Sequence, residues 1–233
     1  MILITLQELI NSGVQLGNTF NLNIIKKNKF IYKKINNICI IDLIQTSKLI
    51  WKLYIFLYKI SFYNKKLLII NSNKLNKFIL KKFIKLTKQF YITEHFISGT
   101  FTNWIFLYNN ILFLNWLNII LNIFKNLNFQ KKISYLYNKL NYKFKNFKGL
   151  QKIPNIIFIL NPIEDKQALK EAFLLKKIII SIIDMNYNPL WITFPIPGNN
   201  INYFSIKLIL EIITTSLLHG QLKNYLFINN LNE

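Results

Sequence analysis

The sequence contains no arginine, so all 30 of its basic residues are lysines. Lysine contacts a phosphate as a point charge and lacks the planar fork with which arginine reads guanine. Only 9 residues are acidic, and the formal charge of +21 calls for a polyanionic partner, either nucleic acid or an anionic membrane surface. We therefore expect recognition of backbone and shape over recognition of base sequence.

Residues that carry catalysis or bind metals are also scarce. Cys39 is the only cysteine, and His95 and His219 are the only histidines, so neither a disulfide framework, a metal site nor a catalytic triad is expected. The 6 glycines form neither G-x-G-x-x-G nor G-x-x-x-x-G-K, the loops that cradle phosphates. We predict that the protein is not an enzyme, uses no cofactor and takes no small-molecule substrate. Asp184, at the end of a predicted strand, is interpreted as a structural carboxylate, with an α/β enzyme that uses it as the alternative.

Alanine is nearly absent, whereas asparagine, lysine, isoleucine, phenylalanine and tyrosine abound. The abundant residues share A+T-rich codons, so the composition indicates an A+T-rich genome before it indicates a structure. The amino terminus has neither the basic start of a signal peptide nor the pattern of a transit peptide. A protein made inside its own organelle would need neither.

One long stretch lacks charge altogether. No lysine, aspartate or glutamate occurs from His95 to Asn122, and Trp104 to Phe124 is long enough to cross a bilayer. Five asparagines interrupt that apolar segment, however, and buried amides are costly in hydrocarbon. We therefore predict a helix packed on protein or RNA, with an integral membrane protein spanning at about 104–124 as the alternative.

Apolar runs and amphipathic segments alternate along the rest of the chain. Runs rich in isoleucine and leucine predict strands at 38–41, 67–70, 156–160 and 178–183, and the run at 178–183 is typical of a strand buried on both faces. Apolar residues at helical spacing predict helices, at 43–58, 75–88, 162–175 and 203–219. This alternation predicts an α/β fold with a doubly wound parallel sheet.

Local patterns define the ends and faces of these elements. Thr5 with Glu8, and Asp42 with Gln45, have the spacing of capping boxes and predict helices that begin after them. The prolines of Pro195–Gly198 are expected to prevent either a helix or a strand from continuing. The helix at 75–88 is expected to bury Leu75, Ile79, Phe83 and Leu86.

Two further long helices are predicted between the strands at 67–70 and 156–160. They form a helical hairpin at 104–148, inserted into an α/β domain made of 1–103 and 149–233. The second helix interleaves lysines with aromatic residues, which suits RNA because cations meet phosphates and rings stack on bases. An A+T-biased amphipathic helix with an ordinary core face is the alternative. The candidate lysines are Lys131, Lys132, Lys139, Lys143, Lys145 and Lys148.

A second lysine cluster lies near the amino terminus, around three apolar and aromatic residues. The pattern fits a solvated charged loop and, in so basic a protein, a phosphate contact equally well. Its members are Lys26, Lys27, Lys29, Lys33 and Lys34.

Several short motifs occur in a fixed order along the chain. They are LINSGVQLG at 9–17, IIDLIQT at 40–46, GTFTNW at 99–104, PN and NP within 154–162, KEA at 170–172, DMNYNP at 184–189 and PIPGN at 195–199. Together they resemble the bacterial and organellar form of universal protein number two of the small ribosomal subunit. GTFTNW is the most specific match, and the resemblance covers roughly residues 5–220. Asn18, Ser98 and Asn200 depart from the histidine, glycine and aspartate of the family pattern.

The resemblance implies a flavodoxin-like α/β domain with a protruding hairpin, a structural constituent of the small ribosomal subunit that supports translation. Its implied partners are small-subunit rRNA and neighbouring small-subunit proteins. To the lysines we add Thr100, Thr102 and Asn103 as expected RNA-binding residues. The coding bias and the loss of arginine indicate an organelle genome, and we favour the ribosome of a mitochondrial matrix over that of a plastid such as an apicoplast.

Overall fold

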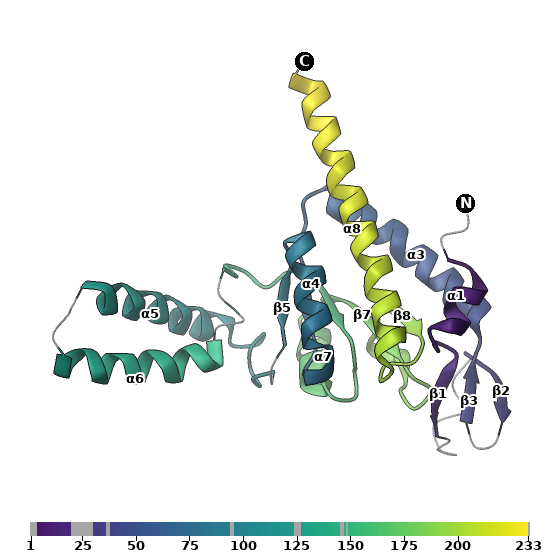
Figure 1. The fold of residues 1–233 in the computed structure, drawn as a ribbon, viewed down its shortest axis with the longest axis horizontal. Helices are drawn as coiled ribbons and strands as arrows, with labels where there is room; N and C mark the ends of the chain where they lie inside the picture. The colour runs from purple at the N-terminus through teal and green to yellow at the C-terminus, as the bar shows by residue number, and fades with distance from the viewer. Residues whose placement is uncertain are drawn as a thin grey trace. The chain divides into compact units, whose positions relative to one another are not determined.

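The computed structural model describes residues 4–19, 30–35, 38–93, 96–123, 127–144, 147 and 149–232. The chain divides into two compact units. Unit 1 combines Met1–Phe96 with Pro154–Glu233, and unit 2 is Ile97–Ile153. Figure 1 shows the helices and strands of both.

Unit 1 is built on a five-stranded sheet in the order β5-β4-β6-β7-β8, and every pair of neighbours is parallel. The strands are β4 (Leu67–Ile70), β5 (Phe90–Ile92), β6 (Ile156–Ile159), β7 (Ile178–Ile183) and β8 (Phe194–Pro197). All residues of β4 and β6 are buried, as expected for strands covered on both faces. The predicted α/β fold with a parallel sheet is therefore confirmed.

Helices cover both faces of this sheet. One layer contains α3 (Leu43–Phe62), α4 (Lys77–Thr87) and α8 (Tyr203–Asn232), whose buried side chains share one core with alternate residues of the strands. On the sheet side those core residues are Leu67, Ile69, Ile156, Phe158, Ile180, Ile182 and Ile196. The helix α7 (Lys166–Leu174) contacts β7 and buries Ala168, Leu169 and Ala172 outside that core (Figure 1). The sheet is thus doubly wound.

The strand predicted at 38–41 exists but belongs to a different sheet. It is β3 (Ile38–Ile41), which pairs antiparallel with β1 (Leu16–Thr19) and β2 (Ile31–Ile35). Only Cys39 and Ile41 of β3 are buried, where they pack on Met185. This strand is half-buried, and a run of four apolar residues does not distinguish that state from burial on both faces.

The expectation that Pro195–Gly198 stops a strand is wrong, because Phe194–Pro197 forms β8. This strand lies at the edge of the parallel sheet. Proline lacks the N–H that a ladder needs, but an edge strand has one side without a partner. The ladder to β7 ends with the Gly198 N–H, which donates to the Ile183 carbonyl oxygen at 3.0 Å.

Most predicted helix starts are confirmed. Thr5 and Glu8 form a complete capping box at the start of α1 (Leu6–Asn11). The Asp42 carboxylate caps α3 and accepts the Ile44 N–H at 2.9 Å. Residues 162–165 form a turn before α7, which therefore begins later than predicted, at Lys166.

The buried face of the helix predicted at 75–88 is only partly the predicted one: Ile79 is buried and Phe83 packs on the core, as expected. Its first turn is a short 3₁₀ helix, η1 (Lys74–Asn76), and α4 begins only at Lys77. Because the turn geometry changes there, Leu75 is exposed, and so is Leu86 near the end of α4. The buried residues of α4 are Ile79, Leu80, Ile84 and Thr87.

The last helix runs to Asn232 and not to the predicted end at His219. Gly220, the residue after the predicted end, lies inside α8 where this helix crosses α3. A Cβ atom on Gly220 would lie 2.4 Å from the Tyr58 carbonyl oxygen, so the glycine permits close packing of the two helices.

Unit 2 contains the two predicted long helices, α5 (Trp104–Ile123) and α6 (Leu127–Phe144), which pack against each other. The buried stripe of α5 is Leu107, Ile111, Leu114 and Leu117. Ile133 is the corresponding buried residue of α6. Gly99 before the helices and Gly149 after them have positive φ angles of 83° and 87°, which glycine adopts without steric cost.

Candidate nucleic-acid interface

The outward face of α6 combines lysines with tyrosines. Four predicted lysines are exposed there, namely Lys131, Lys132, Lys139 and Lys143. Tyr135 and Tyr142 lie on the same exposed side, and α6 contains no acidic residue. Lys145 and Lys148 fall outside the described residues. The face can therefore offer ammonium groups to phosphates and rings to unpaired bases.

The amino-terminal cluster is only partly described. Lys33 and Lys34 are exposed on β2, an outer strand of the antiparallel sheet, and Lys26, Lys27 and Lys29 lie outside the described residues. Lys34 pairs in register with the buried Cys39. Burial raises the pKa of the Cys39 thiol, while the charge of Lys34 acts in the opposite direction. The Cys39 thiol is 1% exposed and is closed to solvent, whereas the two lysines lie at the surface.

The residues of the GTFTNW motif are not equivalent. Thr100 is buried, and its hydroxyl donates to the Ile97 carbonyl oxygen within the turn. Thr102 and Asn103 are exposed. Residues of this motif and of both helices line a cavity of about 210 Å³ in unit 2, among them Ser98, Asn103, Asn110 and Phe144. Amide and hydroxyl groups there can donate or accept hydrogen bonds, but the cavity lining contains no charged group.

A further basic face was expected from the sequence only as the outward side of the helix at 75–88, not as an RNA contact. Residues 74–88 contain six lysines and no acid. Five of them are exposed, namely Lys74, Lys81, Lys82, Lys85 and Lys88. Phe78 projects among them with 79% of its surface exposed. The density of lysine was the available signal, but A+T coding bias offered a competing explanation for it.

The strand end that would hold an α/β active site is closed. Asp184 follows β7 and is 1% exposed. Gly17 of β1 lies over it, and a Cβ on that glycine would come within 3.3 Å of Asp184 Oδ1. The neighbouring Met185 is buried against Cys39 and Ile41 of β3. The antiparallel sheet therefore covers the carboxylate and leaves no room for a substrate.

Asp165, at the carboxyl end of β6, is also structural. Its carboxylate accepts hydrogen bonds from the Ser72 hydroxyl and, at 3.3 Å, from the Ser72 N–H. Burial raises the pKa of Asp165, and the Ser72 bonds lower it in part. The group joins the end of β4 to the turn before α7. Among the described residues no three His, Cys, Asp or Glu side chains gather to hold a metal ion.

Comparison with known proteins identifies the family to which this chain belongs. The family model for Ribosomal protein S2 matches residues 9–220. The chain belongs to the ribosomal protein S2 family. It is 35% identical to the small ribosomal subunit protein uS2c of Toxoplasma gondii, over 96% of this chain and 100% of that protein. Identity is 34% to uS2c of Euglena longa, over 84% of each chain, and 29% to uS2 of Dictyoglomus thermophilum, over 94% of this chain and 90% of the bacterial protein.

As an S2-family member, the chain is a structural, non-enzymatic component of the small ribosomal subunit. The prediction that it is not an enzyme is confirmed, and the buried Asp184 agrees with it. Family membership also implies association with rRNA and with other ribosomal proteins.

One helix of this S2-family protein has the length and composition of a membrane span. Within the part of the chain that the structure describes, α5 alone meets those criteria, and 22% of its apolar window is buried. Length and apolar character are weak evidence, because the helices of soluble proteins also reach them.

Proposed function

We propose that this chain binds small-subunit rRNA through separate lysine faces and serves as a structural constituent of a plastid ribosome. One observation carries the proposal: in a chain of charge +21, the helices α4 and α6 each present exposed lysines with no acidic residue between them. Each lysine that contacts a phosphate releases a condensed counterion, which favours binding. Without arginine, such contacts position the protein on a backbone and do not read guanine.

The proposed contacts include every lysine of the two predicted clusters. They are Lys26, Lys27, Lys29, Lys33, Lys34, Lys131, Lys132, Lys139, Lys143, Lys145 and Lys148, with Thr102 and Asn103 beside them. We add the exposed lysines of η1 and α4. Thr100 supports the interface indirectly, since its hydroxyl holds the turn that presents Thr102 and Asn103.

We further propose that residues 104–148 act as an inserted RNA-binding hairpin within an α/β domain formed by 1–103 and 149–233. The hairpin's two helices pack on each other through Leu107, Ile111 and Leu114 of α5. Internal packing of this kind leaves the lysines of α6 facing outward and available to the RNA.

The relatives change the expected compartment. Several are organellar proteins named uS2c, the chloroplast-type form, and they give no support to the mitochondrion that the sequence alone led us to favour. We therefore propose that the protein is located in a plastid and not in a mitochondrion. Fractionation of the host cell, followed by sequencing of the rRNA that purifies with the protein, checks this: plastid rRNA is expected, and mitochondrial rRNA would contradict it.

The ribosomal role is tested by sedimentation. We expect the protein to move with the small subunit in low-salt gradients and to be released as salt rises, because phosphate contacts lose affinity steeply with salt. Replacing Lys74, Lys81, Lys82 and Lys85 by glutamine should lower the salt concentration that releases it. Sedimentation apart from the small subunit at low salt would disprove the proposal.

A membrane protein is the second candidate, because α5 exposes Phe106, Trp116 and Ile119. Its other face packs on α6, so inserting α5 in a bilayer would draw the lysines of α6 toward the hydrocarbon. Asparagines along α5 would add to the cost. Alkaline carbonate extraction separates the two: a ribosomal protein is released, whereas a membrane-spanning one stays in the pellet.

A further inference from the structure

Two helices of unit 1, α3 and α8, cross at unusually close range. A Cβ on Gly220 of α8 would lie 2.4 Å from the Tyr58 carbonyl oxygen and 2.7 Å from Ser61 Cβ. The Ser61 hydroxyl donates to the Leu217 carbonyl oxygen across the same crossing. Side chains on the outer surface of this crossing are therefore supported by two closely packed helices.

Four rings gather on that outer surface, Trp51, Tyr54 and Tyr58 from α3 and His219 from α8. We call them the α3–α8 ring cluster. The rings of Trp51 and Tyr54 are nearly parallel, at 4°, with centroids 6.1 Å apart. The Tyr54 hydroxyl lies 3.3 Å from His219 Nδ1, and the rings of Tyr58 and His219 are 4.8 Å apart. The cluster is thus oriented by a polar contact between the two helices.

The stack of Trp51 on Tyr54 does not hold the fold together. Both residues belong to α3, three positions apart, so their contact joins no two elements. The other stacked ring pair involving α3, Phe56 with Phe194, links the helix to the sheet and packs on the core. Trp51 instead leaves 39% of its surface exposed. Its ring is consequently open to a partner from outside.

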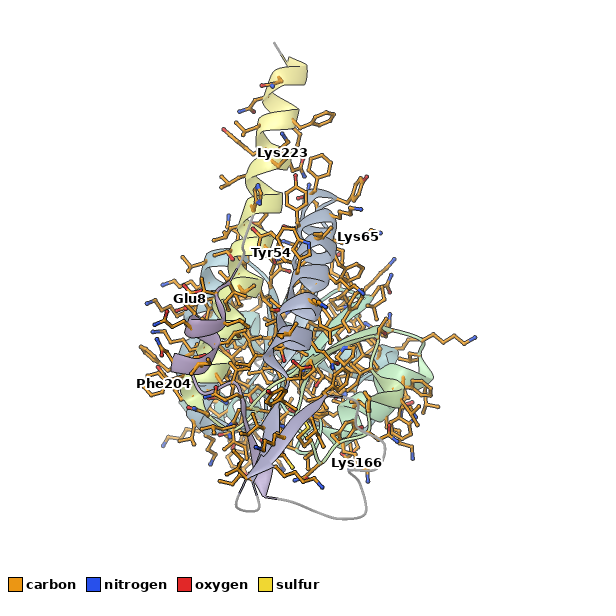
Figure 2. All side chains as sticks on the ribbon, turned by 90° about the vertical axis from the view of Figure 1, so that its right-hand side faces the viewer. Glu8, Tyr54, Lys65, Lys166, Phe204 and Lys223 are labelled. Atoms are coloured by element: carbon orange, nitrogen blue, oxygen red, sulfur yellow. The ribbon has the colours of Figure 1, made fainter. Side chains whose placement is uncertain are left out.

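Positive charge surrounds the ring cluster. Lys48 and Lys52 are exposed on α3, three positions before Trp51 and one position after it, and Lys59 follows Tyr58. On α8, Lys223 lies one turn beyond His219, and Figure 2 shows Tyr54 between the two helices with Lys223 farther along α8. The helix α3 contains no acid. A partner that approaches these rings therefore meets several ammonium groups.

We propose that the α3–α8 ring cluster is a stacking platform for an unpaired nucleobase of the small-subunit rRNA. Trp51 supplies the ring that the base covers, and Lys48 and Lys52 contact the phosphates on either side of it. Every base has a π face, so such a platform accepts any base. This agrees with a chain that has no arginine to read guanine. The inference rests on the proposed rRNA binding, and it adds a base contact on α3 and α8, outside both lysine clusters.

Ultraviolet crosslinking of purified small subunits, followed by mass spectrometry, tests this contact directly. We expect a nucleotide adduct on Trp51 or Tyr54. Adducts on Tyr135 or Tyr142 of α6 with none on α3 would overturn the platform and leave rRNA binding intact. A crosslink from the cluster to an acidic protein would overturn it in favour of a protein partner. Failure of the protein to associate with rRNA at all would overturn both proposals.

Variants sharpen the test in binding of the full chain to small-subunit rRNA. Trp51→Leu should weaken binding by about tenfold or more without changing the slope of log affinity against log salt, because a stacked ring releases no counterion. Trp51→Phe should retain most of the affinity. Trp191→Leu is the matched control, since Trp191 is 37% exposed and also stacks on a neighbour, Phe173. If Trp51→Leu and Trp191→Leu lose rRNA affinity equally, the platform is refuted. A changed salt slope for Trp51→Leu would also refute it. Equal unfolding midpoints for the variants and the unchanged protein exclude misfolding as the cause.

Discussion

The two helices of unit 2, α5 and α6, differ sharply although they pack on each other. No charged residue occurs in α5, whose outward face carries Phe106, Trp116 and Ile119 among asparagines. The outward face of α6 carries four exposed lysines and two exposed tyrosines. Both helices use leucine and asparagine freely, as A+T-rich codons favour.

That difference separates coding bias from function. A bias toward A+T-rich codons acts on neighbouring segments alike, and it supplies lysine as readily as asparagine. It cannot by itself explain why one helix has only amides at its polar positions while the next has lysines. The segregation of charge to α6 therefore supports a partner for that face which is anionic, whereas the α5 face suits an uncharged neighbour.

The largest effect is expected where α5 faces α6. Leu114 is fully buried, so Leu114→Ala removes packing and leaves a cavity that should cost about 2–5 kcal/mol of stability in unit 2. The exposed Ile119 is the matched position, and Ile119→Ala should stay within about 0.5 kcal/mol. Amide hydrogen exchange of α5 and α6 in the full chain measures both. Similar losses at the two positions would mean that both faces of α5 are packed.

The next effect concerns charge on α6. Replacing Lys131, Lys132, Lys139 and Lys143 by glutamine should reduce the slope of log affinity for small-subunit rRNA against log salt by about 3 to 4, one counterion for each lost contact. Titration of the full chain with rRNA at several salt concentrations gives the slope.

Four exposed amides of α5 provide the control for the α6 variant. Asn109, Asn115, Asn118 and Asn122 are all exposed, and their replacement by glutamine should leave the slope unchanged. If replacing the four α6 lysines leaves the salt slope unchanged, as the α5 control does, those lysines form a solvated face. The difference in charge between the two helices then has another origin.

Much of the fold could be predicted because its strands are short, apolar runs. The bounds of β4 and β7 match the predictions, since strands covered on both faces are nearly continuous apolar runs, which Ser181 alone interrupts in β7. The antiparallel sheet escaped prediction because β2 is almost entirely exposed and has no such run. The prediction of α8 ended too early, at His219, and the role of the next residue, Gly220, in a helix crossing is visible only in the tertiary structure.

The candidate site could be predicted less completely. The exposed positions of Lys131, Lys132, Lys139 and Lys143 followed from the helical period, because their apolar neighbours define the inner face. The ring cluster joins α3 to His219 of α8, residues far apart in sequence, so no local pattern could indicate it. The burial of Thr100 was hidden for a similar reason, since threonine is mostly exposed and its motif alone does not show what covers it.

The smallest effect distinguishes the two threonines that precede α5. The buried Thr100 donates its hydroxyl hydrogen bond inside the turn, so Thr100→Val should cost about 1 kcal/mol of stability in unit 2. Thr102 is exposed, so Thr102→Val should change stability by less than about 0.5 kcal/mol while weakening rRNA binding. Hydrogen exchange and rRNA titration on both variants separate support of the turn from contact with the RNA. If Thr100→Val instead lost rRNA affinity without losing stability, Thr100 would contact the RNA. Unit 2 would then not divide at this turn into a packed inner side and a binding outer side.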